Sequence, residues 1–122
     1  MEALKQKSIL IVEDDENIRD FLMEVLDEYV LSIACDGDEA IDNIKDNRYD
    51  LVITDLRMPT VPGEEVVKFV NANKPETKVI VISGYSSLYA VNQTVNNGAS
   101  AFLSKPFSIK ELLQTVSRVL GS

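Results

Sequence analysis

Five short apolar runs, separated by stretches with helical periodicity, constrain the fold of this chain more than any other feature. The runs are Ser8–Val12, Val30–Ala34, Leu51–Thr54, Lys78–Ile82 and Ala101–Leu103. Unbroken apolar runs bounded by turn residues are typical of strands that are covered on both faces. Because strands that alternate with helices need crossover connections, the pattern predicts a parallel sheet with helices on both sides.

The stretch after each run has the apolar spacing of one helix face. Asp36 with Glu39, and Ser108 with Glu111, have the spacing of a capping box at a helix start. The fourth predicted helix, roughly Ser87–Asn97, is weak because asparagine and threonine are poor helix formers. The last predicted helix has the most regular apolar face, formed by Ile109, Leu112, Leu113, Val116, Val119 and Leu120.

Polar residues of distinctive types follow four of the five predicted strands. Glu13 and Asp14 follow the first, Asp55 the third, Ser83 the fourth and Lys105 the fifth. In a parallel sheet these strand ends share one edge, where α/β proteins place their ligands. Each residue alone has an ordinary interpretation, as a helix-terminal acid, a turn residue or a solvated lysine. Together they predict one pocket.

The residue types in this pocket suit phosphoryl transfer. Three neighbouring carboxylates repel one another unless a positive charge lies between them, and Mg²⁺ prefers a few carboxylates with water and a phosphate oxygen. Lys105 offers a compact charge and Ser83 a hydroxyl donor for further phosphate oxygens. Such chemistry needs positioning and charge neutralisation, with Asp55 as the nucleophile that forms an aspartyl phosphate.

The composition excludes several functional classes and bounds the domain organisation and the location of the chain. The 122 residues suit one core, and we expect a single domain over residues 1–122. The absence of histidine excludes a serine–histidine–acid triad, a histidine metal site and a phosphohistidine. The net charge of −8 disfavours direct binding to nucleic acid or to an anionic membrane. Cys35 is the only cysteine, and no apolar run reaches transmembrane length, so we expect a partly buried thiol and a cytoplasmic location.

The chain resembles the receiver domain of two-component response regulators along nearly its whole length. The matching motifs are Val12-Glu13-Asp14 with Arg19 downstream, Asp55-Leu56-Arg57-Met58-Pro59, Pro62-Gly63, Ser83-Gly84 and Phe102-Leu103-Ser104-Lys105-Pro106-Phe107. The resemblance implies an α/β, flavodoxin-like fold with strand order 2-1-3-4-5. It also implies Mg²⁺-dependent phosphorylation of Asp55 by a sensor histidine kinase or a phosphotransfer protein, which would switch the binding of a downstream effector protein or output domain.

The resemblance assigns a metal role to four residues. Asp14 would bind the metal directly and Glu13 mainly through water. Asp55 would be a further ligand, and Arg57 would contribute its backbone carbonyl rather than its side chain.

The resemblance also assigns the phosphoryl contact and the switch. Lys105 would contact the phosphoryl group, and its peptide bond to Pro106 should be cis. Ser83 and Phe102 would form the switch pair, in which Ser83 turns toward the phosphoryl group and Phe102 rotates into the space that opens. The first helix and the loop after Lys105 would receive the kinase.

Three residues depart from the commoner family pattern. Glu13 stands in place of an aspartate, Ser83 in place of a threonine and Phe102 in place of a tyrosine. The first two exchanges keep the charge and the hydroxyl, whereas the third removes a phenolic hydrogen bond. The resemblance also implies that Arg57 and Tyr85, two residues after Asp55 and Ser83, border the path of the attacking water, and their bulk then predicts slow self-dephosphorylation.

Three other functions are weaker candidates. Haloacid-dehalogenase-type phosphatases also use a strand-end aspartate but need a second acid two residues later, where this chain has Arg57. A nucleotide- or flavin-binding protein would need a glycine-rich phosphate cradle, whereas residues 13–15 are acidic and would repel phosphate. A constitutive interaction module has no need of the complete set of phosphoacceptor residues. We therefore expect a phosphoacceptor rather than an enzyme; the residues do not distinguish a stand-alone receiver from part of a longer regulator.

Overall fold

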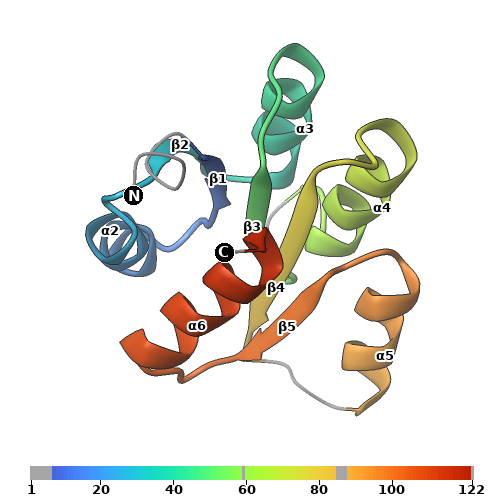
Figure 1. Ribbon diagram of the computed structural model, residues 1–122. Coiled ribbons are helices and arrows are strands. Elements are labelled where there is room, and N and C mark those ends of the chain that lie inside the picture. The colour runs from blue at the N-terminus through green and yellow to red at the C-terminus, as the bar shows by residue number, and fades with distance from the viewer. Residues whose placement is uncertain (1–6, 59, 85–87, 122) are drawn as a thin grey trace.

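A computed structural model describes residues 7–58, 60–84 and 88–121 of the chain. Within them, five strands alternate with five helices (Figure 1). In chain order the elements are β1 (Ser8–Val12), α2 (Glu16–Val25), β2 (Val30–Ala34), α3 (Gly37–Asp46), β3 (Leu51–Asp55), α4 (Gly63–Asn73), β4 (Lys78–Ser83), α5 (Leu88–Asn96), β5 (Ala101–Ser104) and α6 (Ile109–Leu120). The predicted alternation of strand and helix is confirmed.

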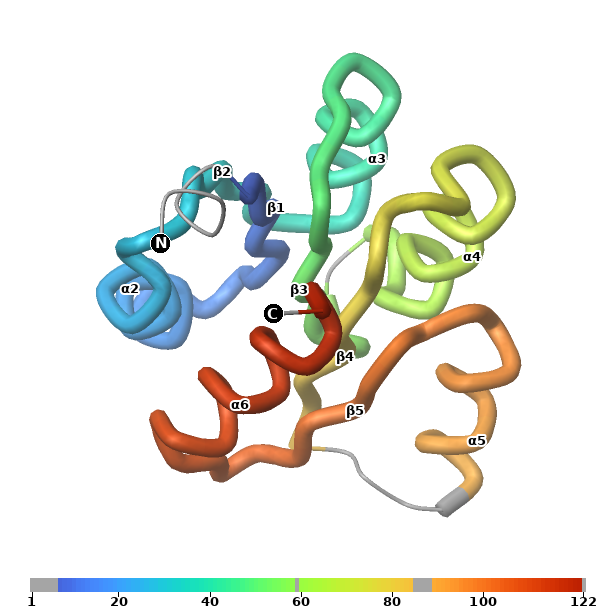
Figure 2. Tube along the Cα trace, viewed as in Figure 1, coloured from blue at the N-terminus to red at the C-terminus, as the bar shows by residue number. Residues whose placement is uncertain are grey.

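The strands form one parallel sheet in the order β2-β1-β3-β4-β5. Figure 2 shows the chain returning through a helix after each strand before the next strand begins. The predicted strand order and the flavodoxin-like fold are therefore confirmed. Because all strands run the same way, their carboxyl ends lie along one edge of the sheet.

Alternate strand residues point into two separate apolar layers, as the pleat of a strand requires. In β1, Leu10 and Val12 belong to the layer beneath α3 and α4, whereas Ile9 and Ile11 belong to the layer beneath α2 and α6. Figure 1 shows these two pairs of helices on opposite faces of the sheet, with α5 on the side of α3 and α4. The two layers bury the central strands on both faces, which explains their unbroken apolar sequences.

The helix starts follow the predicted capping residues. Ser108 accepts a hydrogen bond from the Glu111 amide, and the Glu111 side chain accepts one from the Ser108 amide, so the capping box of α6 is complete. At α3, the Asp36 side chain accepts a hydrogen bond from the Glu39 amide, as the capping box predicts. The Glu39 carboxylate, however, accepts from the Cys35 amide and not from the Asp36 amide, so the return bond of the capping box is made one residue earlier in the chain.

The structure differs from the sequence-based expectation in three places. Strands β3, β4 and β5 each continue one residue further than their apolar runs, so that Asp55 and Ser83 are strand residues. On α6, Ile109 and Leu113 are 51% and 40% exposed, because the helix contacts the sheet along the neighbouring line of Leu112 and Val116. Cys35 is exposed rather than partly buried, since it follows β2 at the edge of the sheet.

Within the described part of the chain, no helix combines the length and apolar character that a bilayer crossing needs.

Candidate functional site

The third strand places Asp55 at the centre of the carboxyl edge of the sheet. Its backbone is in register with Ile82 of β4, and the residue is only 8% exposed. Asp55 Oδ1 accepts a hydrogen bond from the Arg57 amide at 3.2 Å, which is the local turn interaction typical of an aspartate at a strand end. This contact uses one carboxylate oxygen and leaves Oδ2 facing the next element of the site.

Lys105 reaches Asp55 from the end of the fifth strand. Its amide donates to the Ser83 carbonyl at 3.0 Å, which ties the residue to the end of β4. Its ammonium nitrogen Nζ lies 2.7 Å from Asp55 Oδ2 and 3.4 Å from Glu13 Oε1. The peptide bond between Lys105 and Pro106 is cis. One cation is thus shared by two carboxylates from different strands.

This ion triad shifts two of its pKa values. Burial raises the pKa of Glu13, and the nearby charge of Asp55 adds to the increase, while the Asp15 amide and Lys105 act in the opposite direction. Burial lowers the pKa of Lys105, but the hydrogen bond to Asp55 and the charges of both carboxylates outweigh it, so the pKa lies above its ordinary value. Lys105 is therefore protonated at neutral pH.

The three consecutive acids after β1 lie in three different environments. Glu13 is buried; its Oε2 accepts from the Asp15 amide at 3.1 Å, and its carbonyl accepts from Arg19 Nη1 at 3.1 Å. Asp14 is exposed. Asp15 caps α2 by accepting from the Asn17 and Ile18 amides. Of these three acids, Asp15 is the one whose side chain caps the helix.

The donor chemistry of the site fits a hard cation such as Mg²⁺. Glu13 and Asp55 present carboxylate oxygens to one shared positive charge, the Lys105 ammonium. Across the described ranges, no three acidic or cysteine side chains are already gathered as a metal-holding group. Glu13, Asp14 and Asp55 are the carboxylates that would hold the metal, and their charge would then be divided between the metal and Lys105.

A hollow of about 340 Å³ opens beside Asp55. Its lining residues are Asp55, Arg57, Ser83, Gly84 and Lys105. Ser83 is only 1% exposed, so the residue is held tightly at the strand end. Of the residues expected at this site, Tyr85 and Pro59 lie outside the described residues. The hollow brings together the predicted nucleophile, hydroxyl and lysine.

Phe102, the other member of the predicted switch pair, lies on β5, further from the carboxyl edge of the sheet than Ser83. It is half-buried and packs against the apolar layer beneath α3 and α4. Its register partner is Val81, two residues before Ser83. Ser83 and Phe102 therefore lie on adjacent strands, β4 and β5.

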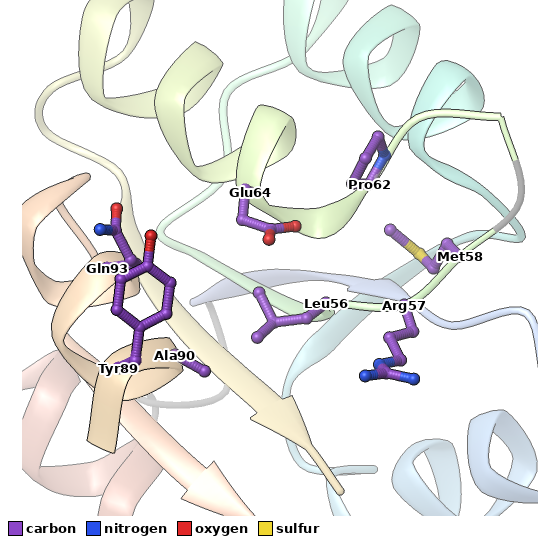
Figure 3. A pocket seen from close by; sticks show the side chains of 8 residues that line it. All are labelled: Leu56, Arg57, Met58, Pro62, Glu64, Tyr89, Ala90 and Gln93. Atoms are coloured by element: carbon purple, nitrogen blue, oxygen red, sulfur yellow. The ribbon is translucent and has the colours of Figure 1, made fainter. Parts of the chain in front are cut away.

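A larger cleft of about 580 Å³ lies between the end of β3 and α5 (Figure 3). Figure 3 shows Arg57 and Met58 at one end of it and Tyr89 and Gln93 of α5 at the other. Among the described residues that line this cleft, Glu64 is the one carboxylate. The cleft lacks the clustered charges of the smaller hollow, which is therefore the better candidate site.

The structure adds two residues to the surroundings of the site that the sequence analysis left without a role there. The Thr54 hydroxyl donates to the Asp55 carbonyl at 2.9 Å, and Arg19 donates to the Glu13 carbonyl. A hydroxyl residue inside an otherwise apolar strand was the signal that would have drawn attention to Thr54.

Comparison with known proteins supports one family. Residues 9–117 match the family described as response regulator receiver domain. A curated relative, the response regulator ArlR of Staphylococcus haemolyticus, is 36% identical over 115 residues, which are 93% of this chain and 52% of that protein. The ArlR of Staphylococcus aureus is 34% identical over 114 residues, again 52% of its length. This chain therefore spans about half the length of the curated relatives that it matches.

Solved structures agree with the sequence relatives. A CheY-like receiver domain protein from Methanospirillum hungatei superposes with a TM-score of 0.90 at 30% identity, covering 95% of this chain and 94% of the other. The BeF3-activated DrrB receiver domain gives a TM-score of 0.87 at 28% identity, covering 96% and 99%. Together with the fold and the acidic edge around Asp55, these matches show that the chain belongs to the response regulator receiver domain family of two-component systems.

Proposed function

We propose that this receiver is a phosphoacceptor in which the Asp55 carboxylate takes up a phosphoryl group in the presence of Mg²⁺. The observation that carries the proposal is the position of Asp55. Its side chain is 10% exposed, opens onto a hollow that it shares with Ser83, and lies 2.7 Å from the Lys105 ammonium. A buried carboxylate with an adjacent cation and hydroxyl is suited to receive and hold a transferred phosphoryl group.

The step is a displacement at phosphorus. A carboxylate oxygen of Asp55 forms a bond to the phosphorus atom of a phosphohistidine or an acyl phosphate. The bond from phosphorus to the donor nitrogen or oxygen breaks, and its electron pair leaves with the donor. The product is an acyl phosphate on Asp55, and no oxidant or reductant takes part.

The chain's own residues stabilise the charge that accumulates in this step. Lys105 is the cation within reach of Asp55 Oδ2, and it would move from the carboxylate oxygen to an oxygen of the transferred group. The Ser83 hydroxyl would donate to another oxygen of that group. The Arg57 amide keeps Asp55 Oδ1 oriented through its 3.2 Å hydrogen bond. Bound Mg²⁺ would neutralise the negative charge that the phosphoryl group brings to Glu13, Asp14 and Asp55.

The change of partner binding would begin at Ser83. Its movement toward the phosphoryl group would release space near Val81, where Phe102 packs from the adjacent strand. Phe102 carries no hydroxyl, so its rotation depends on packing alone. The helix next to this strand, α5, has 72% exposed Tyr89 and 52% exposed Val95, and it is the surface that would change.

A donor protein would approach from the side of α2. Phe21 is 37% exposed, and its ring centroid lies 6.2 Å from that of Phe107. With Ile18 and Pro106 these rings line an apolar hollow of about 320 Å³ that also includes Lys105. A sensor histidine kinase or phosphotransfer protein that packs on this hollow would bring its phosphohistidine close to Asp55.

The proposed role is that of a switch rather than an enzyme with a separate substrate. The curated relatives are about twice as long as this chain, so the output that follows phosphorylation belongs to a downstream effector protein or to an output domain. A cytoplasmic location is part of the same proposal, since the phosphodonor proteins of such systems act there.

The proposal is tested by intact-mass spectrometry after incubation with acetyl phosphate and Mg²⁺. We expect a gain of one phosphoryl group in the wild-type protein, no gain in Asp55→Asn, and no gain when EDTA removes the metal. Asp46→Asn is the matched control because Asp46 is an exposed aspartate at the end of α3.

The outcomes separate the parts of the proposal. A gain that persists in Asp55→Asn shows that another residue is the acceptor. A gain that survives EDTA contradicts the role of the metal. No gain in the wild-type protein from either acetyl phosphate or a phosphorylated histidine kinase contradicts the phosphoacceptor function.

A further inference from the structure

Thr54 is a polar residue in a place where the sheet needs none. It is completely buried, and its register partners are Val12 of β1 and Val81 of β4. Both valines belong to the apolar layer beneath α3 and α4. A valine would match this position in size, so the hydroxyl calls for an explanation beyond packing.

The Thr54 hydroxyl donates to the main-chain carbonyl oxygen of Asp55 at 2.9 Å. Gly63, the first residue of α4, packs closely against the same oxygen. A Cβ atom on Gly63 would collide with Asp55 O and lie 2.7 Å from Leu56 Cα. The Asp55–Leu56 peptide is therefore contacted both by a hydrogen-bond donor and by closely packed backbone.

This peptide leads the chain from Asp55, the last residue of β3, into the loop that contains Arg57. In the loop that follows this peptide, the Arg57 amide donates a hydrogen bond to Asp55 Oδ1, while Lys105 Nζ donates to Asp55 Oδ2. A rotation of the peptide plane would move the Arg57 amide relative to the carboxylate. Because a misplacement of about 1 Å can cost a catalytic step up to about a hundredfold in rate, the orientation of this peptide matters for reactivity.

We propose that Thr54 is a positioning residue for the phosphoacceptor: its hydroxyl fixes the Asp55–Leu56 peptide and thereby the orientation of the Asp55 carboxylate. The inference rests on the proposed function for its effect on phosphorylation. Its structural part, the coupling of the hydroxyl to the Arg57–Asp55 hydrogen bond, stands independently of that function.

The test compares Thr54→Val, which removes the hydroxyl and keeps the size, with Thr54→Ser, which keeps the hydroxyl. The matched control is Thr77→Val, because Thr77 is also buried and donates to a backbone carbonyl, that of Tyr49 at 2.7 Å, at the opposite ends of the strands. The readouts are the rate of Mg²⁺-dependent phosphorylation by acetyl phosphate, the hydrogen-exchange rate of the Arg57 amide by NMR, and the urea midpoint of unfolding.

We expect Thr54→Val to be phosphorylated about tenfold more slowly and to exchange the Arg57 amide faster. Thr54→Val and Thr77→Val should both lower the urea midpoint, because each loses one buried hydrogen bond, but Thr77→Val and Thr54→Ser should keep the wild-type rate and exchange. A slower reaction in Thr54→Val than in Thr77→Val is a result that a purely structural role would not produce.

The proposal is overturned if Thr54→Val and the wild-type protein have equal phosphorylation rates and equal Arg57 exchange. It is also overturned if Thr54→Ser is phosphorylated as slowly as Thr54→Val. If Thr54→Val does not fold, the comparison of Thr54→Ala with Thr54→Ser decides, because both lack the methyl group and differ only in the hydroxyl. If the wild-type protein takes up no phosphoryl group, the proposed function fails, and the Arg57 exchange still tests the positioning role.

Discussion

Lys105 Nζ lies 2.7 Å from Asp55 Oδ2, although the two residues are 50 positions apart in the chain. The same nitrogen is 3.4 Å from Glu13 Oε1. A metal ion held by Glu13 and Asp55, as proposed, would share these carboxylates with Lys105. A receiver built this way keeps its acidic edge compensated before any metal or phosphoryl group binds.

Replacing Lys105 by glutamine should have opposite effects on the affinity for Mg²⁺ and on the rate of phosphorylation. Mg²⁺ affinity should rise roughly fivefold, because removing a like charge about 4 Å away relieves about 1 kcal/mol of repulsion in water. Phosphorylation by acetyl phosphate should fall by about a hundredfold, because a charge-stabilising donor is lost. Isothermal titration calorimetry measures the first quantity and intact-mass kinetics the second.

The matched control for this charge change is Lys68→Gln, since Lys68 is 58% exposed and pairs with Glu65 on the surface of α4. Lys68→Gln should change neither the Mg²⁺ affinity nor the rate of phosphorylation. Weaker Mg²⁺ binding in Lys105→Gln would contradict the competition between the lysine and the metal.

Glu13→Gln should stabilise the metal-free protein at neutral pH by an amount on the order of 1 kcal/mol. The pKa of Glu13 is raised in the folded state, chiefly by burial, above its ordinary value of 4.5. Above pH 4.5 the folded protein therefore binds more protons than the unfolded chain, and its free energy of unfolding falls as the pH rises through the folded-state pKa. Glutamine carries no such penalty, and Lys105 keeps Asp55 as its partner.

Urea unfolding in EDTA at several pH values tests this prediction. The advantage of Glu13→Gln should be largest at neutral pH and should shrink as the pH is lowered and Glu13 becomes protonated. Asp14→Asn is the control, since Asp14 is the exposed neighbour. A less stable Glu13→Gln variant at neutral pH would show that attraction to Lys105 outweighs the burial of the charge.

The parallel sheet could be predicted from the sequence because each central strand is an unbroken apolar run, whereas the strand order followed from the resemblance to receiver domains. The convergence of Glu13, Asp55, Ser83 and Lys105 on one edge followed from the parallel direction of the strands. The pairing of Val12 with Thr54, which brings the start of the acidic run level with Asp55, is set by the folded sheet and not by a local sequence pattern.

Contacts that depend on three-dimensional packing could not be predicted in this way. The Lys105 bridge requires the relative position of β1, β3 and β5, which no local pattern records. The exposure of Ile109 and Leu113 depends on which line of α6 rests on the sheet, whereas the sequence shows only a wide apolar face. The Thr54 hydrogen bond depends on the turn of the main chain after β3.

Gly63→Ala should destabilise the protein by about 2 kcal/mol, the usual cost of forcing an extra carbon atom into a packed interior. Gly63 is needed for space rather than for a positive φ, because its Cβ would collide with the backbone of Asp55 and Leu56. Gly84→Ala is the matched control, since a Cβ there meets nothing within 4 Å. Urea unfolding measures both variants, and equal midpoints would show that the loop after β3 moves aside without cost.

Arg57→Asn should speed the loss of the phosphoryl group several-fold. Arg57 lines the hollow beside Asp55, Ser83 and Lys105. Its long side chain would restrict the approach of water to a phosphoryl group there. Intact mass followed over time after removal of the donor measures the rate of loss. Arg48→Asn is the matched control because Arg48 is 75% exposed and pairs with Glu76, away from Asp55. An unchanged rate in Arg57→Asn would show that water reaches the acyl phosphate by another path, and the same exchange at Tyr85 would then be the next variant to measure.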